Sequence, residues 1–247
     1  IKKLNLFGKT KLYQASSSEM FGDDKAIICG LATLEDKTFM LIGHQKGRDS
    51  KEKVYRNFGM PKPEGYRKAL RAMKLAEKFH LPIITFIDTP GAYPGIDAES
   101  RNQSIAIAEN LYAMSQIKTP IISIVIGEGG SGGALAIGVS DRLAMLQYSI
   151  YSVISPEGCA SILWKDASKA NIAADALSIT SEKLLNHNLI DRVIPEPAGA
   201  AHRDSNAMYS ALKSNMTDLL NEVNHIPIND LLELRKSKLS SYGQFES

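Results

Sequence analysis

Apolar and polar positions follow a regular pattern from residue 26 onward, whereas residues 1–25 are poorly patterned. Apolar, largely β-branched runs predict strands at 26–34, 38–43, 82–87, 120–126, 143–146 and 150–154. Helical spacing predicts helices from Pro63 onward, at about 104–115, at 156–164, and over most of the chain after residue 166, with a break near 192–197. Because helices lie between strands, the pattern favours parallel pairing and an α/β fold.

Two glycine-rich segments follow the predicted strands at 82–87 and 120–126. The first is DTPGAYPG at 88–95, and the second is GEGGSGGA at 127–134. The order of strand, glycine turn and buried helix leaves bare backbone N–H groups at a helix N-terminus, where an anion is favoured. Glycine loses the most freedom on folding, so five in seven residues is costly and indicates a function. Since both segments end a strand, their N–H groups can converge on one oxygen as an oxyanion hole.

The second segment also matches a dinucleotide-binding fingerprint. Gly127, Gly129 and Gly132 satisfy GxGxxG between a predicted strand and a predicted helix. The fingerprint requires a carboxylate about twenty residues later, and residues 147–149 contain none. A dinucleotide-binding enzyme is therefore a poorly supported alternative. A P-loop is excluded, because Ala134 stands where its lysine is required.

Candidate nucleophiles lack the partners that they need. Ser131 lies among glycines at a strand-to-helix turn, but a nucleophilic serine requires a base within hydrogen-bond reach. None of the five histidines is expected in a strand-end loop beside the glycine turns, and His44 and His80 are expected at the surface or at a helix end. Ser131 is therefore interpreted as a small residue or a helix cap, and Cys159 as a core residue.

Composition changes this picture little. The net charge of +2 over 247 residues does not imply nucleic-acid binding, and no apolar run is long enough to span a membrane. The two cysteines are expected to be reduced, buried thiols in a cytosolic protein, and no metal-ligand spacing is present. Asp88 is expected to be a strand-end acceptor, and Asp97 and Glu99 to be solvated. One basic cluster can hold phosphates or form a solvated face: Lys46, Arg48, Lys51, Lys53 and Arg56.

Several longer motifs occur in order along the chain: YRNFGM at 55–60, PEGYRKA at 63–69, FIDTPGAYPG at 86–95, GEGGSGGALAIG at 127–138, YSVISPEG at 151–158, ID at 190–191, IPEP at 194–197 and GAAHR at 199–203. With these motifs the sequence resembles the α subunits of the bacterial and plastid acetyl-CoA carboxylase carboxyltransferase, over about residues 25–205. It departs from the family at Ser100 and Asn102, where the family has Glu and Gly, and over residues 7–22.

The resemblance implies a crotonase-like fold, a spiral of ββα units with additional C-terminal helices, for a single domain at 26–247. It implies transfer of a carboxyl group from carboxybiotin, carried on the biotin carboxyl carrier protein, to acetyl-CoA, giving malonyl-CoA for fatty-acid synthesis. The implied partners are a zinc-containing β subunit in an α2β2 heterotetramer and, in a larger complex, biotin carboxylase. The implied location is the cytoplasm, with no membrane or nucleic-acid partner and no metal in this chain.

For the site, the resemblance implies that backbone N–H groups stabilise charge on the ureido ring of biotin. By position, we assign the donors to Gly91 or Ala92 in the first segment and to Gly132 or Gly133 in the second. The biotin group is further expected to contact four residues: Tyr93, Gly129, Gly130 and Ser131. Serine peptidases of the same superfold place a histidine downstream of the nucleophile, and none lies between Ser131 and His187. A non-catalytic assembly subunit stays open as a second alternative.

Overall fold

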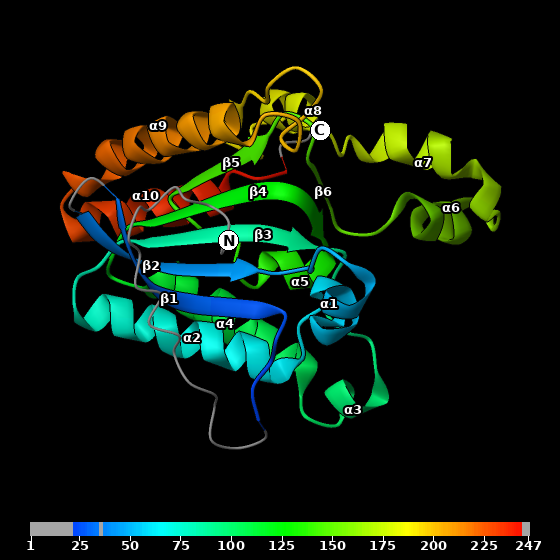
Figure 1. Ribbon diagram of the computed structural model, residues 1–247, viewed down its shortest axis with the longest axis horizontal. Helices are drawn as coiled ribbons and strands as arrows, with labels where there is room; N and C mark the ends of the chain where they lie inside the picture. Colours follow the sequence, from blue (N-terminus) through cyan, green and yellow to red (C-terminus); the bar gives the residue numbers. More distant parts are fainter. Residues whose placement is uncertain (1–21, 35–36, 244–247) are drawn as a thin grey trace.

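Seven strands form one sheet in the computed structural model, which describes residues 22–34 and 37–243 (Figure 1). The strands are β1 (Ile27–Leu34), β2 (Lys37–His44), β3 (Ile83–Thr89), β4 (Ile121–Gly130), β5 (Arg142–Leu146), β6 (Ile150–Ser152) and β7 (Arg192–Ile194). Their order is β1-β2-β3-β4-β5-β7, and β6 pairs with the end of β4. Only β1 and β2 are antiparallel among these pairs, so the carboxyl ends of β2, β3 and β4 meet at one edge.

Helices cover both faces of the sheet. In Figure 1, α2 (Pro63–Lys78) and α4 (Gln103–Gln116) lie below it, and α9 (Ser205–Asn224) lies above. The other helices of the described chain are α1 (Ser50–Tyr55), η2 (Asn57–Gly59), α3 (Ile96–Glu99), α5 (Ser131–Leu135), α6 (Pro156–Trp164), η3 (Ala167–Lys169), α7 (Ala170–Leu177), α8 (Ser181–Asn186) and α10 (Ile228–Ser240). Helices α6 and α7 form an arm that stands apart from the rest of the molecule (Figure 1).

The central strands are buried on both faces because their successive side chains enter two different cores. Ile83 and Ile87 of β3 pack in the core that includes residues of α2 and α4. Ile84 and Phe86, between them, pack in the core that includes the apolar face of α9. The near-continuous apolar runs of the sequence follow from this double burial.

The predicted elements are confirmed in kind and near their expected bounds, and the main differences concern β4, α1 and β7. Strand β4 continues through the glycines to Gly130, so these residues are strand and not turn. A short helix, α1, lies in the polar stretch after residue 46, and Asp49 caps it by accepting a hydrogen bond from the Glu52 N–H. Strand β7 lies within the predicted break and pairs in parallel with β5. Most of the poorly patterned segment 1–25 lies outside the described residues.

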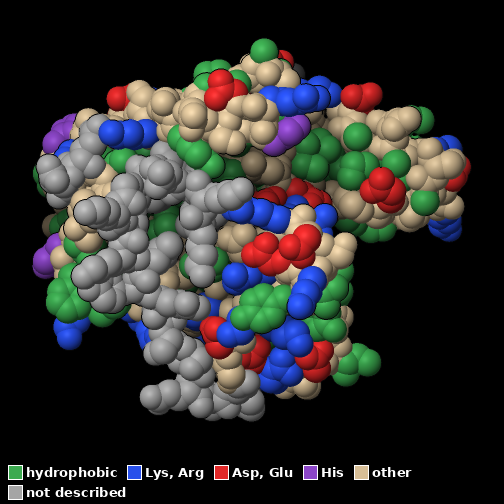
Figure 2. Space-filling view, in the orientation of Figure 1, with side chains coloured by type: hydrophobic (Ala, Val, Ile, Leu, Met, Phe, Trp, Pro, Cys, Tyr) green, Lys and Arg blue, Asp and Glu red, His purple; other side chains and the backbone are tan. Residues whose placement is uncertain are grey.

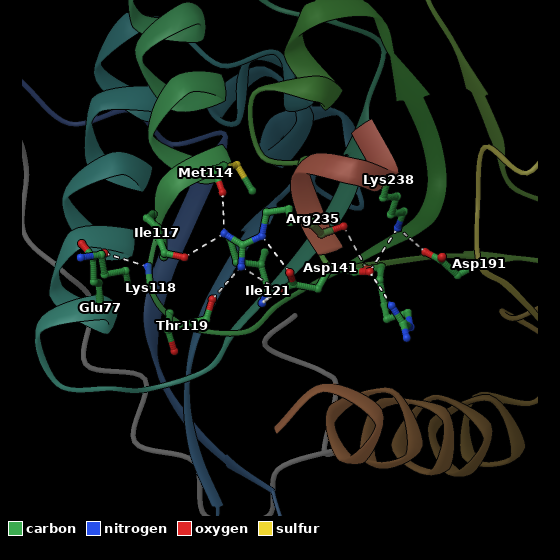
Figure 3. Close-up of polar contacts among 12 residues, drawn as sticks. Glu77, Met114, Ile117, Lys118, Thr119, Ile121, Asp141, Asp191, Arg235 and Lys238 are labelled. Carbon is green, nitrogen blue, oxygen red and sulfur yellow. Dashed lines mark hydrogen bonds and ion pairs between the residues drawn. The ribbon is translucent and has the colours of Figure 1, made fainter. Parts of the chain in front are cut away.

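A buried ion pair closes the amino-terminal edge of β4 and β5. Arg235 of α10 is 1% exposed and donates to both carboxylate oxygens of Asp141, each at 2.8 Å (Figure 3). Its remaining N–H groups donate to the carbonyls of Met114, Ile117 and Thr119, at and beyond the end of α4. Asp141 also accepts a hydrogen bond from the Ile121 N–H at the start of β4. All five guanidinium donors are therefore satisfied, which is the condition for burying this charge.

Candidate active site

The two glycine segments lie in direct contact at the carboxyl edge of the sheet. A Cβ at Gly130 would overlap the Pro90 carbonyl group, and one at Gly133 would overlap the Ala92 nitrogen and lie 2.5 Å from the Gly91 carbonyl carbon. Any side chain at these two positions would push the segments apart. Glycine is therefore required here by close backbone approach, and the two segments converge as the sequence predicts.

Free backbone donors come from both segments at this contact. No described residue accepts a backbone hydrogen bond from the Ala92 N–H, whereas the Gly91 N–H donates to the Thr89 hydroxyl at 3.1 Å. Gly132 and Gly133 lie in the first turn of α5, where N–H groups have no carbonyl partner in their own helix. The geometry therefore favours Ala92 over Gly91 in the first segment, together with Gly132 or Gly133 in the second.

Gly132 itself does not need to be glycine for steric reasons. Its φ is not in the left-handed range, and the nearest atoms to an added Cβ belong to Ile107 at 3.8 Å. Helix α5 has five residues, so its dipole is smaller than the sequence pattern implied. The dinucleotide interpretation also fails locally, because Gly127 and Gly129 lie inside β4 rather than in a turn after it.

Ser131 is not a helix cap. The N-cap of α5 is Gly130, and no side-chain hydrogen bond caps this helix. Ser131 is exposed and has a φ of 55°, in the left-handed range that serine seldom adopts. A strained serine at a strand-to-helix turn is also found in nucleophile elbows. Here, however, no described base forms a hydrogen bond with its hydroxyl, so the structure offers no means of activating it.

An apolar cavity of about 400 Å³ opens beside the second segment. Ser131 and Gly132 lie at its side, and Leu135, Leu184 and Leu239 are among the apolar residues that line it. Tyr151 reaches this cavity from β6, and burial raises its pKa to about 12, so it stays a neutral hydrogen-bonding group. A cavity of this size, with few polar groups near one end, is typical of small-molecule sites.

The first segment is held from outside by neighbouring loops. The Tyr93 N–H donates to the Pro61 carbonyl at 3.0 Å, and the side-chain amide of Gln103 donates to the carbonyls of both Pro61 and Tyr93. The Lys62 ammonium lies 4.9 Å from the centre of the Tyr93 ring. Asn102 has a φ of 65°, which explains why the family places glycine there and why asparagine is tolerated.

The structure adds two residues that the sequence analysis missed. His44 was expected at the surface or at a helix end, but it is the last residue of β2 and 2% exposed, and its Nδ1 accepts a 3.4 Å hydrogen bond from the Asp88 N–H at the start of the first segment. Lys46 was placed in a basic cluster, but its Nζ lies 3.0 Å from Asp88 Oδ1 and 2.7 Å from Glu128 Oε2. Asp88 is an acceptor as predicted, since it receives the Glu128 N–H. The signal available in the sequence was the position of His44 directly after a predicted strand.

Charged side chains gather where α1 and the ends of β2 and β3 lie (Figure 2). Arg56, from the basic cluster, donates to the Lys25 carbonyl and lies 3.9 Å from Glu52. Asp97 is exposed, and ion pairs with Lys62 and Arg101 hold its pKa below its usual value. Of the basic cluster, Lys46 and Arg56 thus lie in separate ion pairs, whereas Arg48, Lys51 and Lys53 are exposed.

The cysteines, possible metal ligands and possible membrane-spanning helices were also considered in the sequence. Both cysteines are free and buried, as predicted. Within residues 22–34 and 37–243, no group of three or more His, Cys, Asp or Glu residues could hold a metal ion. In the same ranges, none of the helices combines the length and apolarity that crossing a membrane requires.

Solved structures of carboxyltransferases and a decarboxylase share this fold. The chain matches a Pseudomonas malonate decarboxylase hetero-tetramer in complex with coenzyme A with a TM-score of 0.73 at 17% identity, over 89% of each chain. It matches the transcarboxylase 12S hexamer with a TM-score of 0.67 at 16% identity, over 90% of this chain and 38% of that one. The fold is crotonase-like, which confirms the expectation from the sequence.

Sequence relatives are much closer. The chain is 60% identical over 236 residues to the acetyl-coenzyme A carboxylase carboxyl transferase subunit alpha of Methylococcus capsulatus, covering 96% of this chain and 74% of that protein. It is 62% identical over 226 residues to the protein of the same name from Nitrosomonas eutropha, covering 92% and 70%. Residues 9–243 match the family model described as acetyl co-enzyme A carboxylase carboxyltransferase-like. With motifs, fold and relatives in agreement, this chain belongs to the family of acetyl-CoA carboxylase carboxyltransferase α subunits.

Proposed function

We propose that the two glycine segments form the anion site of a carboxyltransferase half-reaction and stabilise negative charge on the ureido group of biotin. As a member of its family, the chain takes part in carboxyl transfer to acetyl-CoA, which yields malonyl-CoA for fatty-acid synthesis. Bound carboxybiotin supplies the carboxyl group, and its ureido oxygen becomes negatively charged when that group leaves. The chain's own contribution is a set of preorganised N–H donors, each worth roughly 3–4 kcal/mol in other enzymes.

The contact between Gly133 and Ala92 is the observation that supports this proposal most strongly. It brings the free N–H of one segment to the first turn of α5, without a side chain between them. No nucleophile is needed for this role, which agrees with the isolated hydroxyl of Ser131. The donors lower the barrier because the charge on the ureido oxygen is absent in the bound carboxylated form and develops as the transition state is reached.

The adjoining cavity supports the proposed ligand by its volume of about 400 Å³ and by its polarity. The biotin ring system is largely apolar and carries one ureido group. The cavity is largely apolar, and the second glycine segment lies at its side. Tyr93, Gly129, Gly130 and Ser131 stay in the proposal as residues near the biotin group. Of these, Gly129 packs against the Tyr151 ring, and the absence of a side chain at Gly129 leaves space for that ring.

We further propose that the chain works in an α2β2 complex with a zinc-containing β subunit, and receives biotin from the biotin carboxyl carrier protein of a cytoplasmic complex that includes biotin carboxylase. The family name, subunit alpha, implies a multi-subunit enzyme. Unpartnered apolar side chains on and near the arm support a partner: Val153, Ile162, Leu163 and Ile172 are 56–74% exposed. Large exposed apolar residues grouped in this way are typical of surfaces that bind another protein.

Substitution of Gly133 tests the anion site. In the assembled complex, Gly133→Ala should lower kcat at least ~100-fold, because its methyl group separates the two segments. The KM for acetyl-CoA should change little, since acetyl-CoA is expected to bind mainly on the β subunit. Steady-state carboxyl transfer, measured in complexes first shown to be α2β2 by sedimentation, gives both constants.

Two further variants separate the effect of segment contact from that of any added methyl group. Gly132→Ala is the matched control, because the added methyl group has room and the backbone N–H is kept. The decrease in kcat of Gly132→Ala should therefore be at least ten times smaller than that of Gly133→Ala. Ala92→Pro removes the free N–H of the first segment directly and should reproduce the Gly133→Ala defect. If Gly133→Ala and Ala92→Pro both assemble and transfer carboxyl groups at near wild-type rates, the segments are not the anion site.

A further inference from the structure

His44 lies beneath the contact between the two glycine segments. It is the last residue of β2, and β2 runs parallel to β3 with Gly43 opposite Phe86. The side chain is 2% exposed, and its Nδ1 accepts the hydrogen bond from the Asp88 N–H. Asp88 lies three residues before Gly91. One ring nitrogen of His44 thus holds the strand residue from which the first segment leaves the sheet.

The other ring nitrogen of His44 faces the second segment. Because Nδ1 is an acceptor, the ring proton is on Nε2. Burial, followed by the charge on Lys46, lowers the pKa of His44 to about 3, and the backbone carbonyls of Phe86 and Gly133 oppose this shift. The imidazole is therefore neutral, and among the described residues its buried Nε2 has no partner that meets hydrogen-bond geometry. The ring thus lies between the two segments: it accepts from the Asp88 N–H and lies near the Gly133 backbone.

Lys46 joins the same two segments from the exposed side. Its Nζ contacts Asp88 of β3 and Glu128 of β4, and Asp88 also accepts the Glu128 N–H at 3.2 Å. Burial lowers the pKa of Lys46, but Asp88 and Glu128 outweigh burial and raise it above its usual value. The Lys46 stem packs against Gly59, where an added Cβ would lie 2.6 Å from Lys46 Cγ. The ammonium is thereby held charged between the two strand ends.

We infer that the carboxyl end of β2 is the third element of the site, in which His44 and Lys46 position the two glycine segments relative to each other. Both residues are positioning residues, because neither is required to touch the reacting group. A displacement of about 1 Å in a catalytic arrangement can cost ~100-fold in rate. Contacts that fix the ends of β3 and β4 relative to each other therefore affect how well the segments stabilise the transition state. The inference rests on the anion site proposed above.

The test uses variants of both residues in the assembled complex. Lys46→Met keeps the stem and removes the charge, and His44→Phe keeps a buried ring and removes both nitrogens. Each should lower kcat ~10- to 100-fold while the KM for acetyl-CoA changes less than ~3-fold. His44→Asn, whose amide oxygen can replace Nδ1 as acceptor for the Asp88 N–H, should recover part of the loss. Lys37→Met is the matched control, because Lys37 lies at the other end of β2 and donates to Asn221.

A double-substitution cycle separates positioning from general stability. If Lys46 acts through the first segment, adding Lys46→Met to Ala92→Pro should cost less than ~3-fold further in kcat. Full additivity of the two losses, or near wild-type kcat in both Lys46→Met and His44→Phe while Ala92→Pro is impaired, would overturn the positioning role alone. Near wild-type kcat in Ala92→Pro and Gly133→Ala would instead overturn the anion site, and the positioning role with it.

Discussion

The two edges of the parallel part of the sheet are built in opposite ways. At the amino-terminal edge, Arg235 and Asp141 are almost fully buried, and every guanidinium donor has an acceptor. At the carboxyl-terminal edge, the described residues include no backbone partner for the Ala92 N–H and none that meets hydrogen-bond geometry with His44 Nε2, and Ser131 has a left-handed φ. Complete pairing stabilises one edge, whereas the other leaves the Ala92 N–H without a backbone partner among the described residues, so that this donor can stabilise a ligand's charge.

This contrast shows where the chain can accept strain. A glycine contact that leaves N–H groups unpaired is tolerable only on a rigid support. The same strand, β4, starts at the Asp141 carboxylate and ends in the glycine segment, so the paired edge supports the unpaired one. The contrast predicts large stability effects at the amino edge, and effects on rate or acid sensitivity at the carboxyl edge.

Removing the buried charge should give the largest effect on stability. Arg235→Met leaves Asp141 as an uncompensated buried carboxylate and three carbonyl groups without their donor, so the free energy of unfolding should fall by about 3–5 kcal/mol. Urea unfolding followed by circular dichroism measures this change. Lys183→Met, which removes an exposed pair with Asp175 at 3.3 Å, is the control and should cost about 1 kcal/mol or less. Equal costs for the two variants would contradict the difference between a buried, fully paired charge and an exposed one.

His44 should make the carboxyl edge sensitive to acid. Its pKa is about 3 in the fold and about 6.5 in the unfolded chain, so between these values the unfolded state binds one more proton. Uptake of this proton favours the unfolded state. The contribution of His44 therefore lowers the free energy of unfolding as pH falls below about 6.5, by at most about 1.4 kcal/mol per pH unit. His44→Phe lacks this term, so the difference in unfolding free energy between wild type and variant should shift steadily in the variant's favour from pH 7 to pH 4.

An exposed histidine provides the comparison for that experiment. His225, at the end of α9, is exposed and lies 2.9 Å from the Asn221 carbonyl. The same measurement on His225→Gln controls for the loss of a histidine that is not buried. Parallel curves for wild type and His44→Phe over the whole range would show that the buried imidazole does not stay neutral.

Ser131 should give the smallest effect. Its hydroxyl does not cap α5, and no base among the described residues forms a hydrogen bond with it, so Ser131→Ala should change the free energy of unfolding by less than about 1 kcal/mol. Carboxyl transfer in the assembled complex should stay within ~3-fold of wild type. A loss of several orders of magnitude in a folded, assembled variant would restore the nucleophile interpretation and remove the need for an anion site built from backbone groups alone.

Much of the fold was predictable because its signals are local. Pro63 opens α2 as its spacing predicts, and Ser155 caps α6 by accepting the Gly158 N–H. The convergence of the two glycine segments followed from parallel strands ending at one edge. Strand β7 escaped prediction because three residues carry little periodicity, and it is stabilised by pairing with β5. The extent of β4 escaped because glycine usually ends a strand, whereas here pairing with β6 and the close approach of Pro90 keep it extended.

The sequence by itself determined the α/β pattern, the family and the two glycine segments, since each depends on residues close together in the chain. Only the tertiary structure decided which glycines are required: Gly130 and Gly133 face the backbone of residues about forty positions earlier, whereas Gly132 has room. The burial of His44 between the segments, where a surface or helix-end position was expected, was likewise decided only by the tertiary structure. The physical reason is that burial and contact across parallel strands depend on register and crossover helices, which short-range patterns do not specify.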